Sequence, residues 1–146
     1  MLFRSIKAVT PTSGAGWYEV NQSFWHHALT ADDQLRQRVA FALSEIFVVS
    51  SVADCVSSSP RGLASYYDTL ADNSFADFRV LLEKVTLHPI MGCYLSHLKN
   101  QRENTKTGRV PDENYAREVM QLFSIGLYQL NADGSLKTDE IGRAHV

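Results

Sequence analysis

The sequence has 146 residues, of which 45% are hydrophobic and 21% are charged, and its formal net charge is −2 at pH 7. This length and composition fit one globular domain with enough apolar residues for a core. The basic residues are dispersed along the chain, which argues against nucleic acid as a partner. Nothing in the composition indicates a particular cofactor.

The chain is expected to begin with an irregular segment over residues 1–16, because Pro11, Gly14 and Gly16 interrupt any apolar run there. Neither a signal peptide nor a transmembrane segment is visible. Residues 17–29 predict a helix by their periodicity. Its apolar face consists of Trp17, Val20, Phe24 and Leu29.

A second helix is predicted from residue 34, after a stretch at residues 30–33 that resembles a capping box. Its apolar face consists of Leu35, Val39, Ala42, Leu43 and Ile46, with further apolar residues up to Val49. We expect it to be the central helix of the domain. Arg38 and Glu45 lie two turns apart on one side, so they need each other or another partner if that side is buried.

The middle of the chain predicts a loop followed by three helices. Residues 50–60 are rich in serine and lack a period, and Ser59 with Pro60 makes a good helix start. The helix that follows has the core residues Leu63, Tyr66, Tyr67 and Leu70. Asn73 or Ser74 is expected to cap the next helix, whose apolar stripe is Phe75, Phe78, Leu81, Leu82 and Val85. His88 and Pro89 precede a shorter helix over residues 90–98.

The two cysteines, Cys55 and Cys93, belong to no paired-cysteine motif. An even number permits a disulfide, but the sequence does not decide whether the two residues meet. Cys93 also lies four residues before His97, a spacing that places two metal ligands on one face of a helix. Because no second pair completes such a site, the sequence predicts no metal site.

Residues 111–126 form the most distinctive stretch, and the polar residues 100–110 predict an exposed connection that leads into it. Pro111 suits the first helical position, and negative charge at Asp112 and Glu113 suits the positive end of the helix dipole. Gly126 is expected to end the helix. One face carries Asn114, Arg117, Glu118 and Gln121, and the other carries Tyr115, Val119, Leu122 and Phe123.

Two interpretations of the polar face stay open. On the first, it is a solvated surface on which pairs such as Glu113 with Arg117 contribute about 0.3–0.5 kcal/mol each. On the second, it is a buried cluster that binds a metal ion or a polar ligand, in which Asn114 reaches Glu118. The amides of Asn114 and Gln121 favour the second interpretation, because they add little to a solvated face. A further alternative pairs the carboxylates of Glu45 and Glu118.

The stretch at residues 112–118 reads Asp-Glu-Asn-Tyr-Ala-Arg-Glu and resembles the Asn-Glu-Asn-Tyr-Ala-Arg-Glu signature of the bacterial family called domain of unknown function 1800. Residues 38–50, 73–82 and 88–91 resemble further motifs of that family, in the same order. Glu113, Asn114, Arg117 and Glu118 match the signature, whereas Asp112 replaces its usual Asn. Members are generally longer bacterial proteins and many are exported, so the resemblance implies a fragment of an exported protein. It does not imply an established activity.

The C-terminal part allows a small β-hairpin, because residues 127–130 alternate weakly and residues 131–134 predict a turn. We interpret the last residues of the chain as not belonging to the native protein. Residues 141–146, Ile-Gly-Arg-Ala-His-Val, can be back-translated into part of a common short-read sequencing adapter, and the end of a Glu140 codon also fits. We therefore expect one helical domain over residues 17–139 and a non-native tail over residues 140–146.

The sequence thus predicts an all-α, multi-helix domain with short connections and supports two functional hypotheses. The first is a binding or scaffold module of the cell envelope, in which the polar face of the signature helix forms a buried network and the partner is an envelope protein. The second is a metal-dependent or hydrolase-like enzyme, in which Glu113 and Glu118 supply carboxylates and Arg117 clamps an anion. The first is preferred, because no nucleophile and base are paired in the chain.

Overall fold

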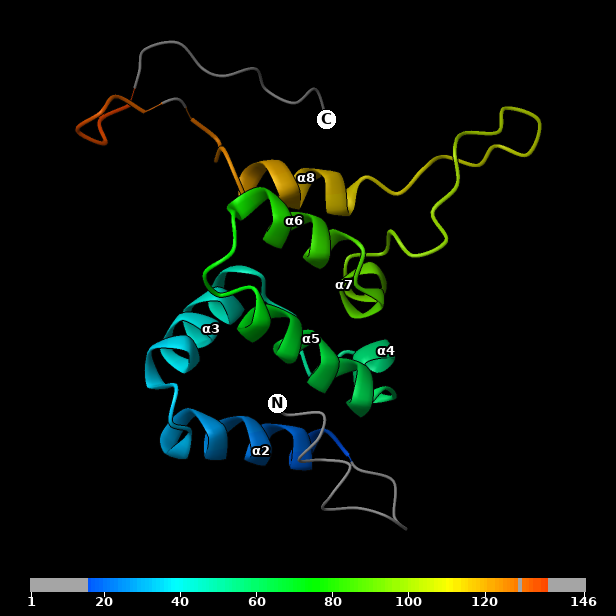
Figure 1. The fold of residues 1–146 in the computed structure, drawn as a ribbon. Coiled ribbons are helices and arrows are strands. Elements are labelled where there is room, and N and C mark those ends of the chain that lie inside the picture. Colours follow the sequence, from blue (N-terminus) through cyan, green and yellow to red (C-terminus); the bar gives the residue numbers. More distant parts are fainter. Residues whose placement is uncertain (1–15, 129, 137–146) are drawn as a thin grey trace. The chain divides into compact units, whose positions relative to one another are not determined.

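The computed structural model describes residues 16–128 and 130–136 (Figure 1). Over these residues the chain is all-α, as predicted, with the helices α2 (Trp17–Thr30), α3 (Gln34–Ile46), α4 (Asp54–Ser57), α5 (Pro60–Asp72), α6 (Phe78–Thr86), α7 (Pro89–Tyr94) and α8 (Asn114–Gln121). None of these helices is long and apolar enough to cross a membrane. The chain divides after Leu98 into two compact units. The proposed tail, residues 140–146, lies outside the described residues, as does the N-terminal segment except for Gly16.

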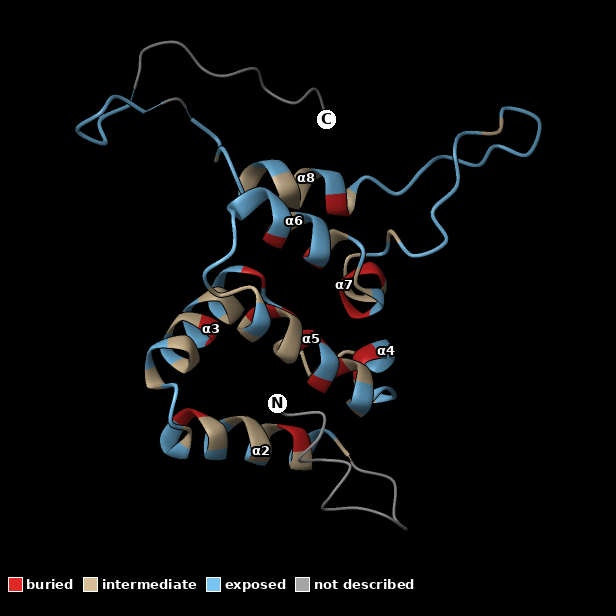
Figure 2. Cartoon of the chain, in the orientation of Figure 1, coloured by how far each residue is buried: buried red, intermediate tan, exposed pale blue. Residues whose placement is uncertain are grey.

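The core of the first unit is built around α5, which packs against each of the other helices of that unit. Pro60 occupies the first turn of α5, as predicted, and Leu63, Ala64, Tyr66 and Leu70 are buried along its length (Figure 2). The Tyr66 hydroxyl donates a hydrogen bond to the carbonyl oxygen of Phe47 at 2.6 Å. This buried bond fixes the segment that follows α3 against the centre of the unit.

The prediction that residues 34–49 form the central helix is wrong in two respects. The helix α3 ends at Ile46, and within it only Ala40 is buried, while Leu35 on the predicted apolar face is 70% exposed. Beyond the end of α3, Phe47 and Val49 lie buried in the core. The capping box at residues 30–33 is also wrong, because Thr30 still belongs to α2 and Asp33 is the N-cap of α3.

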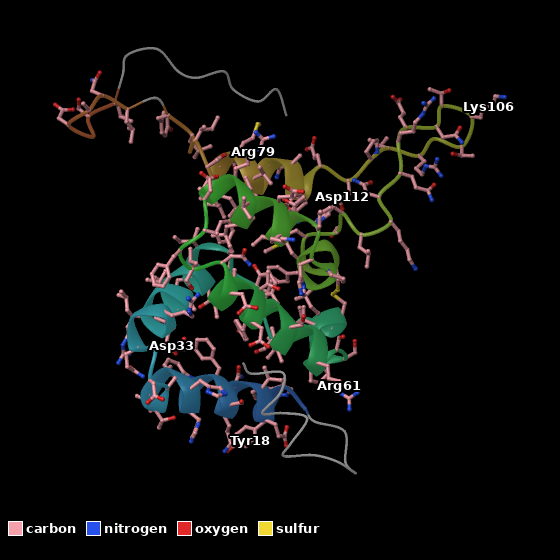
Figure 3. All side chains as sticks on the ribbon, viewed as in Figure 1. Tyr18, Asp33, Arg61, Arg79, Lys106 and Asp112 are labelled. Atoms are coloured by element: carbon pink, nitrogen blue, oxygen red, sulfur yellow. A yellow bond between two sulfur atoms is a disulfide. The ribbon has the colours of Figure 1, made fainter. Side chains whose placement is uncertain are left out.

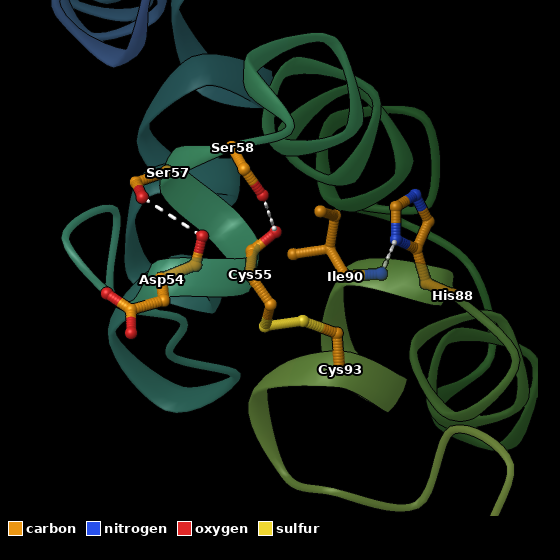
Figure 4. Close-up of a disulfide and its surroundings, with 7 residues drawn as sticks. All are labelled: Asp54, Cys55, Ser57, Ser58, His88, Ile90 and Cys93. Atoms are coloured by element: carbon orange, nitrogen blue, oxygen red, sulfur yellow. Dashed lines mark hydrogen bonds between the residues drawn. A yellow bond between two sulfur atoms is a disulfide. The ribbon is translucent and has the colours of Figure 1, made fainter.

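The predicted loop over residues 50–60 contains the short helix α4, which sequence reasoning missed. One turn of helix is too short to show a periodic pattern. Its Val56 is fully buried, and Cys55 forms a disulfide with Cys93 of α7 (Figure 4). Tertiary contacts therefore hold this helix in place more than its own sequence does.

The helix α6 begins at Phe78 rather than near Phe75, because Asn73 and Ser74 do not cap it. The Asn73 side chain donates to the carbonyl of Thr69 at 2.7 Å, and the Ser74 hydroxyl donates to that of Leu70 at 3.0 Å. Both side chains thus donate to carbonyl groups near the C-terminal end of α5, where a helix leaves carbonyls without intrahelical partners. Asp77 caps α6 instead, where its carboxylate accepts from the backbone N–H of Arg79.

The helix α7 ends at Tyr94, four residues before the predicted end. The backbone N–H of Leu98 folds back to the carbonyl of Gly92 at 2.7 Å, and Ser96 adopts a positive φ of 64°. His97 therefore lies beyond the helix, where its Nε2 is 2.9 Å from the carbonyl oxygen of Thr86. The interpretation of Cys93 and His97 as paired metal ligands is wrong, because the Cys93 sulfur belongs to the disulfide.

The second unit contains α8, the connection that precedes it and a turn near the end of the described chain. The turn is closed by a hydrogen bond from the Asn131 N–H to the Ser135 carbonyl at 2.8 Å. A single antiparallel bridge joins Leu130 and Leu136 beside it. Within the described residues, this bridge and turn are the form that the C-terminal hairpin takes.

Candidate functional site

The candidate site lies in the second unit, in the segment from residue 99 to residue 126, which we call the signature segment. Its helix α8 begins at Asn114 with Glu113 as the N-cap, three residues later than the predicted start at Pro111. The Asp112 carboxylate sets this start, because its Oδ1 accepts from the Asn114 backbone N–H at 2.9 Å. Asp112 thus satisfies one of the amide groups that a helix leaves unpaired at its N-terminus.

Asn100 and Asp112 join the two ends of the connection that precedes α8. The Asn100 side-chain amide donates to the Asp112 carbonyl at 2.6 Å, and its oxygen accepts from the Asp112 backbone N–H at 3.0 Å. Figure 3 shows Asp112 at the base of the connection and Lys106 at its far end. Sequence reasoning missed Asn100, since no periodic pattern links residues on opposite ends of a loop.

The predicted pairing of Glu113 with Arg117 is confirmed. The Arg117 Nη2 lies 2.8 Å from the Glu113 Oε1, one turn apart on α8. Because the side chains are 40% and 66% exposed, the pair contributes no more than about 0.5 kcal/mol. The bond does, however, occupy the guanidinium that the enzyme hypothesis assigns to an anion.

Glu118 has an unusual environment on the same helix. Its Oε2 is buried, and within the described part of the chain it has no hydrogen-bond partner. No hydrogen bond joins Glu118 to Asn114 in that part either, although their spacing predicted one. A buried carboxylate oxygen without a donor is costly, so such groups usually bind a water, an ion or a ligand.

The apolar side of α8 follows the prediction only in part. The rings of Tyr115 and Phe123 are buried and lie 6.4 Å apart between centroids, whereas Leu122 is exposed. Gly126 has a φ of +74° and donates its N–H to the Met120 carbonyl at 3.0 Å. The prediction that Gly126 ends the helix is wrong, because α8 ends at Gln121 with Leu122 as its C-cap. Gly126 instead supplies the positive φ of a later turn, where a side chain would be strained.

The polar residues of the signature segment lie at its surface rather than in a buried network. Asp112 and Glu113 are exposed, while Asn114, Arg117 and Gln121 are half-buried. Glu118 is the member of this set with a buried oxygen that lacks a partner among the described residues. The first interpretation of the polar face, a solvated surface, fits most of the set, and the second fits Glu118.

Arg38 and Glu45 are not brought together by the structure. Both are exposed on α3, and the described residues show no ion pair between them. The pKa of Tyr67 is raised by burial and, to a smaller extent, by the nearby carboxylate of Glu45. Glu45 and Glu118 belong to different units of the chain.

The described residues contain no group of three or more His, Cys, Asp or Glu side chains placed to hold a metal ion. The geometry therefore does not name a metal, and the structure does not point to a particular cofactor. What the signature segment offers is a set of exposed and half-buried polar side chains, together with the buried carboxylate oxygen of Glu118. Such side chains can accept hydrogen bonds from a ligand or a partner protein.

Comparison with known proteins places the chain in a family. A family model described as "Protein of unknown function (DUF1800)" matches residues 7–140. No curated protein matches the chain, and no solved structure does. The match covers both units, including the three upstream motifs and the signature at residues 112–118, so the chain belongs to the DUF1800 family.

Proposed function

We propose that this chain is part of a non-enzymatic binding or scaffold module of the bacterial cell envelope, and that the signature segment forms its binding surface. The observation that carries this proposal is the buried Oε2 of Glu118, for which the described residues supply no donor. A donor from a bound partner offsets the cost of burying this oxygen. Glu118 is only half-buried as a residue, so its carboxylate can turn toward a partner and accept a hydrogen bond at an interface.

The local hydrogen bonds of the segment support a binding role. Asn100 holds Asp112, Asp112 holds the first turn of α8, and Glu113 holds Arg117. The surface around Glu118 is therefore ordered by bonds inside the segment. Preorganisation of this kind lowers the entropy that binding loses.

The disulfide supports the assignment to the envelope. Cys55 and Cys93 are joined with their Cα atoms 6.3 Å apart. Disulfides persist in oxidising compartments such as the bacterial periplasm and are rare in the cytosol. The covalent bond between α4 and α7 is what an exported protein would form, and export agrees with what the family resemblance implies.

A second candidate function is a metal-dependent or hydrolase-like enzyme that uses Glu113 and Glu118 with Arg117 as an anion clamp. The buried Glu118 oxygen favours it, because a carboxylate of this kind suits a general base or a cation ligand. The bond between Arg117 and Glu113 weighs against it, because the clamp would first have to break that pair. We therefore prefer the binding role.

The experiment that tests the proposal replaces Glu118 with Gln in the native bacterium, in a protein that carries a photo-crosslinking amino acid at Gln121. Gln121 lies three residues after Glu118, so the crosslinker reports contacts on the same side of α8. We expect a discrete crosslinked product that Glu118→Gln reduces at least about tenfold, a loss of about 1.4 kcal/mol. A crosslinker at Glu45, on exposed α3, is the matched control and should give no such product.

Stability measurements separate binding from folding in the same variants. Because Glu118 Oε2 lacks a donor among the described residues, a neutral amide should leave the free energy of unfolding unchanged or raise it by about 1 kcal/mol. A crosslink that Glu118→Gln leaves intact would contradict the proposal. Loss of a measurable turnover by Glu118→Gln, without any crosslinked partner, would favour the enzyme instead.

A further inference from the structure

We propose that the basic loop, which we define as residues 99–110, docks on an acidic segment of a protein partner. This inference rests on the proposed binding function and names the chemistry of the partner. The loop carries Lys99, Arg102, Lys106 and Arg109 against one acidic residue, Glu103, in a chain whose net charge is −2. Its local charge is therefore opposite in sign to that of the chain.

The basic side chains of this loop are available for a partner. All four are exposed, and no ion pair engages any of them within the described residues. Arg109 uses its Nε to bond the Arg102 carbonyl at 3.3 Å, but the Arg102 guanidinium and the Lys106 ammonium form no hydrogen bond in the described part of the chain. These two charges can reach a ligand without breaking an existing contact.

The loop is also ordered by its own backbone. Asn104 and Arg109 form an antiparallel bridge with N–H to carbonyl distances of 3.0 and 3.2 Å. The Asn104 carboxamide oxygen accepts from the Lys106 N–H at 3.0 Å, and Gly108 supplies the positive φ of 71° that the turn needs. Together with the bonds between Asn100 and Asp112, this arrangement reduces the ordering that binding would require.

The chemistry of the loop favours an acidic protein segment over other anionic partners. Guanidinium groups form bidentate hydrogen bonds with carboxylates and with phosphates, and the loop presents Arg102 and Arg109, so its other side chains must decide between the two. Its far end, residues 103–108, has no apolar side chain that could enter a bilayer. It also has no aromatic side chain on which a nucleotide base could stack. A membrane surface and a nucleic acid are therefore the outcomes to be excluded by experiment.

The test measures binding of a fluorescent oligoglutamate peptide by anisotropy, with the full chain and with the double variant Arg102→Glu, Lys106→Glu. The matched control is Arg38→Glu, Arg61→Glu, which changes the net charge equally at exposed residues of the first unit. We expect the loop variant to bind at least about tenfold more weakly, and the control to bind within about twofold of the unchanged chain. Raising the salt concentration should weaken binding of the unchanged chain more than that of the loop variant.

Three results would overturn the proposal. Equal losses in the two double variants would show that net charge, and not the loop, attracts the peptide. Tighter binding of phosphatidylglycerol vesicles or single-stranded DNA, with the same dependence on Arg102 and Lys106, would assign the loop to a membrane or a nucleic acid. If the crosslinked partner depends on Glu118 but not on the loop charges, the binding function stands and the docking proposal fails. Thermal unfolding of both double variants checks that each is folded.

Discussion

The two units of this chain are stabilised in different ways. The first unit buries apolar side chains around α5 and adds a covalent bond between α4 and α7. The signature segment of the second unit buries Tyr115 and Phe123 and is also held by exposed hydrogen bonds, such as those of Asn100 with Asp112 and of Arg117 with Glu113. Burial gives stability, whereas exposed polar bonds contribute little to it. The exposed hydrogen bonds of the signature segment are therefore expected to add less stability than the buried core of the first unit does.

Removing the disulfide should have the largest effect on the first unit. The double variant Cys55→Ser, Cys93→Ser loses a crosslink between residues 38 positions apart, and we expect the free energy of unfolding to fall by about 3 kcal/mol. Urea unfolding with and without a reductant measures this. The unchanged chain under reductant should match the double variant, and hydrogen exchange in α8 should stay the same. A loss that extends to α8 would break the distinction between the units.

Removing one buried hydrogen bond should have a smaller effect. Tyr66→Phe deletes the hydroxyl that donates to the Phe47 carbonyl, and we expect a loss of about 1–2 kcal/mol in thermal or urea unfolding. Tyr67→Phe is the matched control, because the neighbouring tyrosine is only half-buried and its hydroxyl forms no hydrogen bond within the described residues. Equal losses in the two variants would show that the hydroxyl bond is not what holds the segment after α3.

Acidification should weaken the first unit through His88. Its Nδ1 accepts from the Ile90 N–H at the start of α7, its ring packs edge-on against Tyr66, and burial lowers the pKa of His88 below its usual 6.5. As the pH falls, His88 therefore takes up a proton at a higher pH in the unfolded chain than in the folded chain. The stability that neutral His88 gives to the folded state is complete above pH 6.5 and is lost as the pH falls from 6.5 through the lowered pKa.

His88→Asn provides the test, because asparagine can cap a helix but does not titrate. We expect unfolding measured between neutral and mildly acidic pH to depend less on pH in this variant than in the unchanged chain. Burial also lowers the pKa of His27, so some dependence should persist. An unchanged profile in His88→Asn would contradict this role of His88.

The smallest effect is expected at the exposed ion pair of the signature segment. Glu113→Gln removes the charge that faces Arg117, and we expect a loss of about 0.3–0.5 kcal/mol, reduced further by salt. Calorimetric unfolding in low and high salt measures it. A loss above about 1 kcal/mol would show that the pair stabilises the segment strongly and would weaken the contrast between the two units.

The sequence predicted the features that depend on local chemistry. The helices α2 and α5 and the pair of Glu113 with Arg117 follow from periodicity and helix spacing. The start of α6 could not be predicted in this way, because Asn73 and Ser74 are equally suited to ending one helix or starting the next.

Features that depend on distant contacts were not predicted. The face of α3 was misjudged because Phe47, beyond its end, enters the core in place of Leu35 and Ile46. The disulfide and the bonds of Asn100 with Asp112 join residues far apart in the sequence, so no spacing rule indicates them. For the candidate site, the sequence named the residues of α8 and left open whether they are buried, because the burial of the Glu118 oxygen depends on packing.

The disulfide determines whether the protein stays in one piece after a protease cuts it. Cys55 and Cys93 enclose all of α5 and α6 in one covalent ring, and the turn between these helices exposes Phe75, Ala76 and Asp77. Exposed turns are where proteases cut folded proteins. A single cut in this turn would leave both pieces linked through sulfur and still packed along α5. The nicked protein can therefore persist as one molecule, and its cleavage would be visible only after the disulfide is reduced.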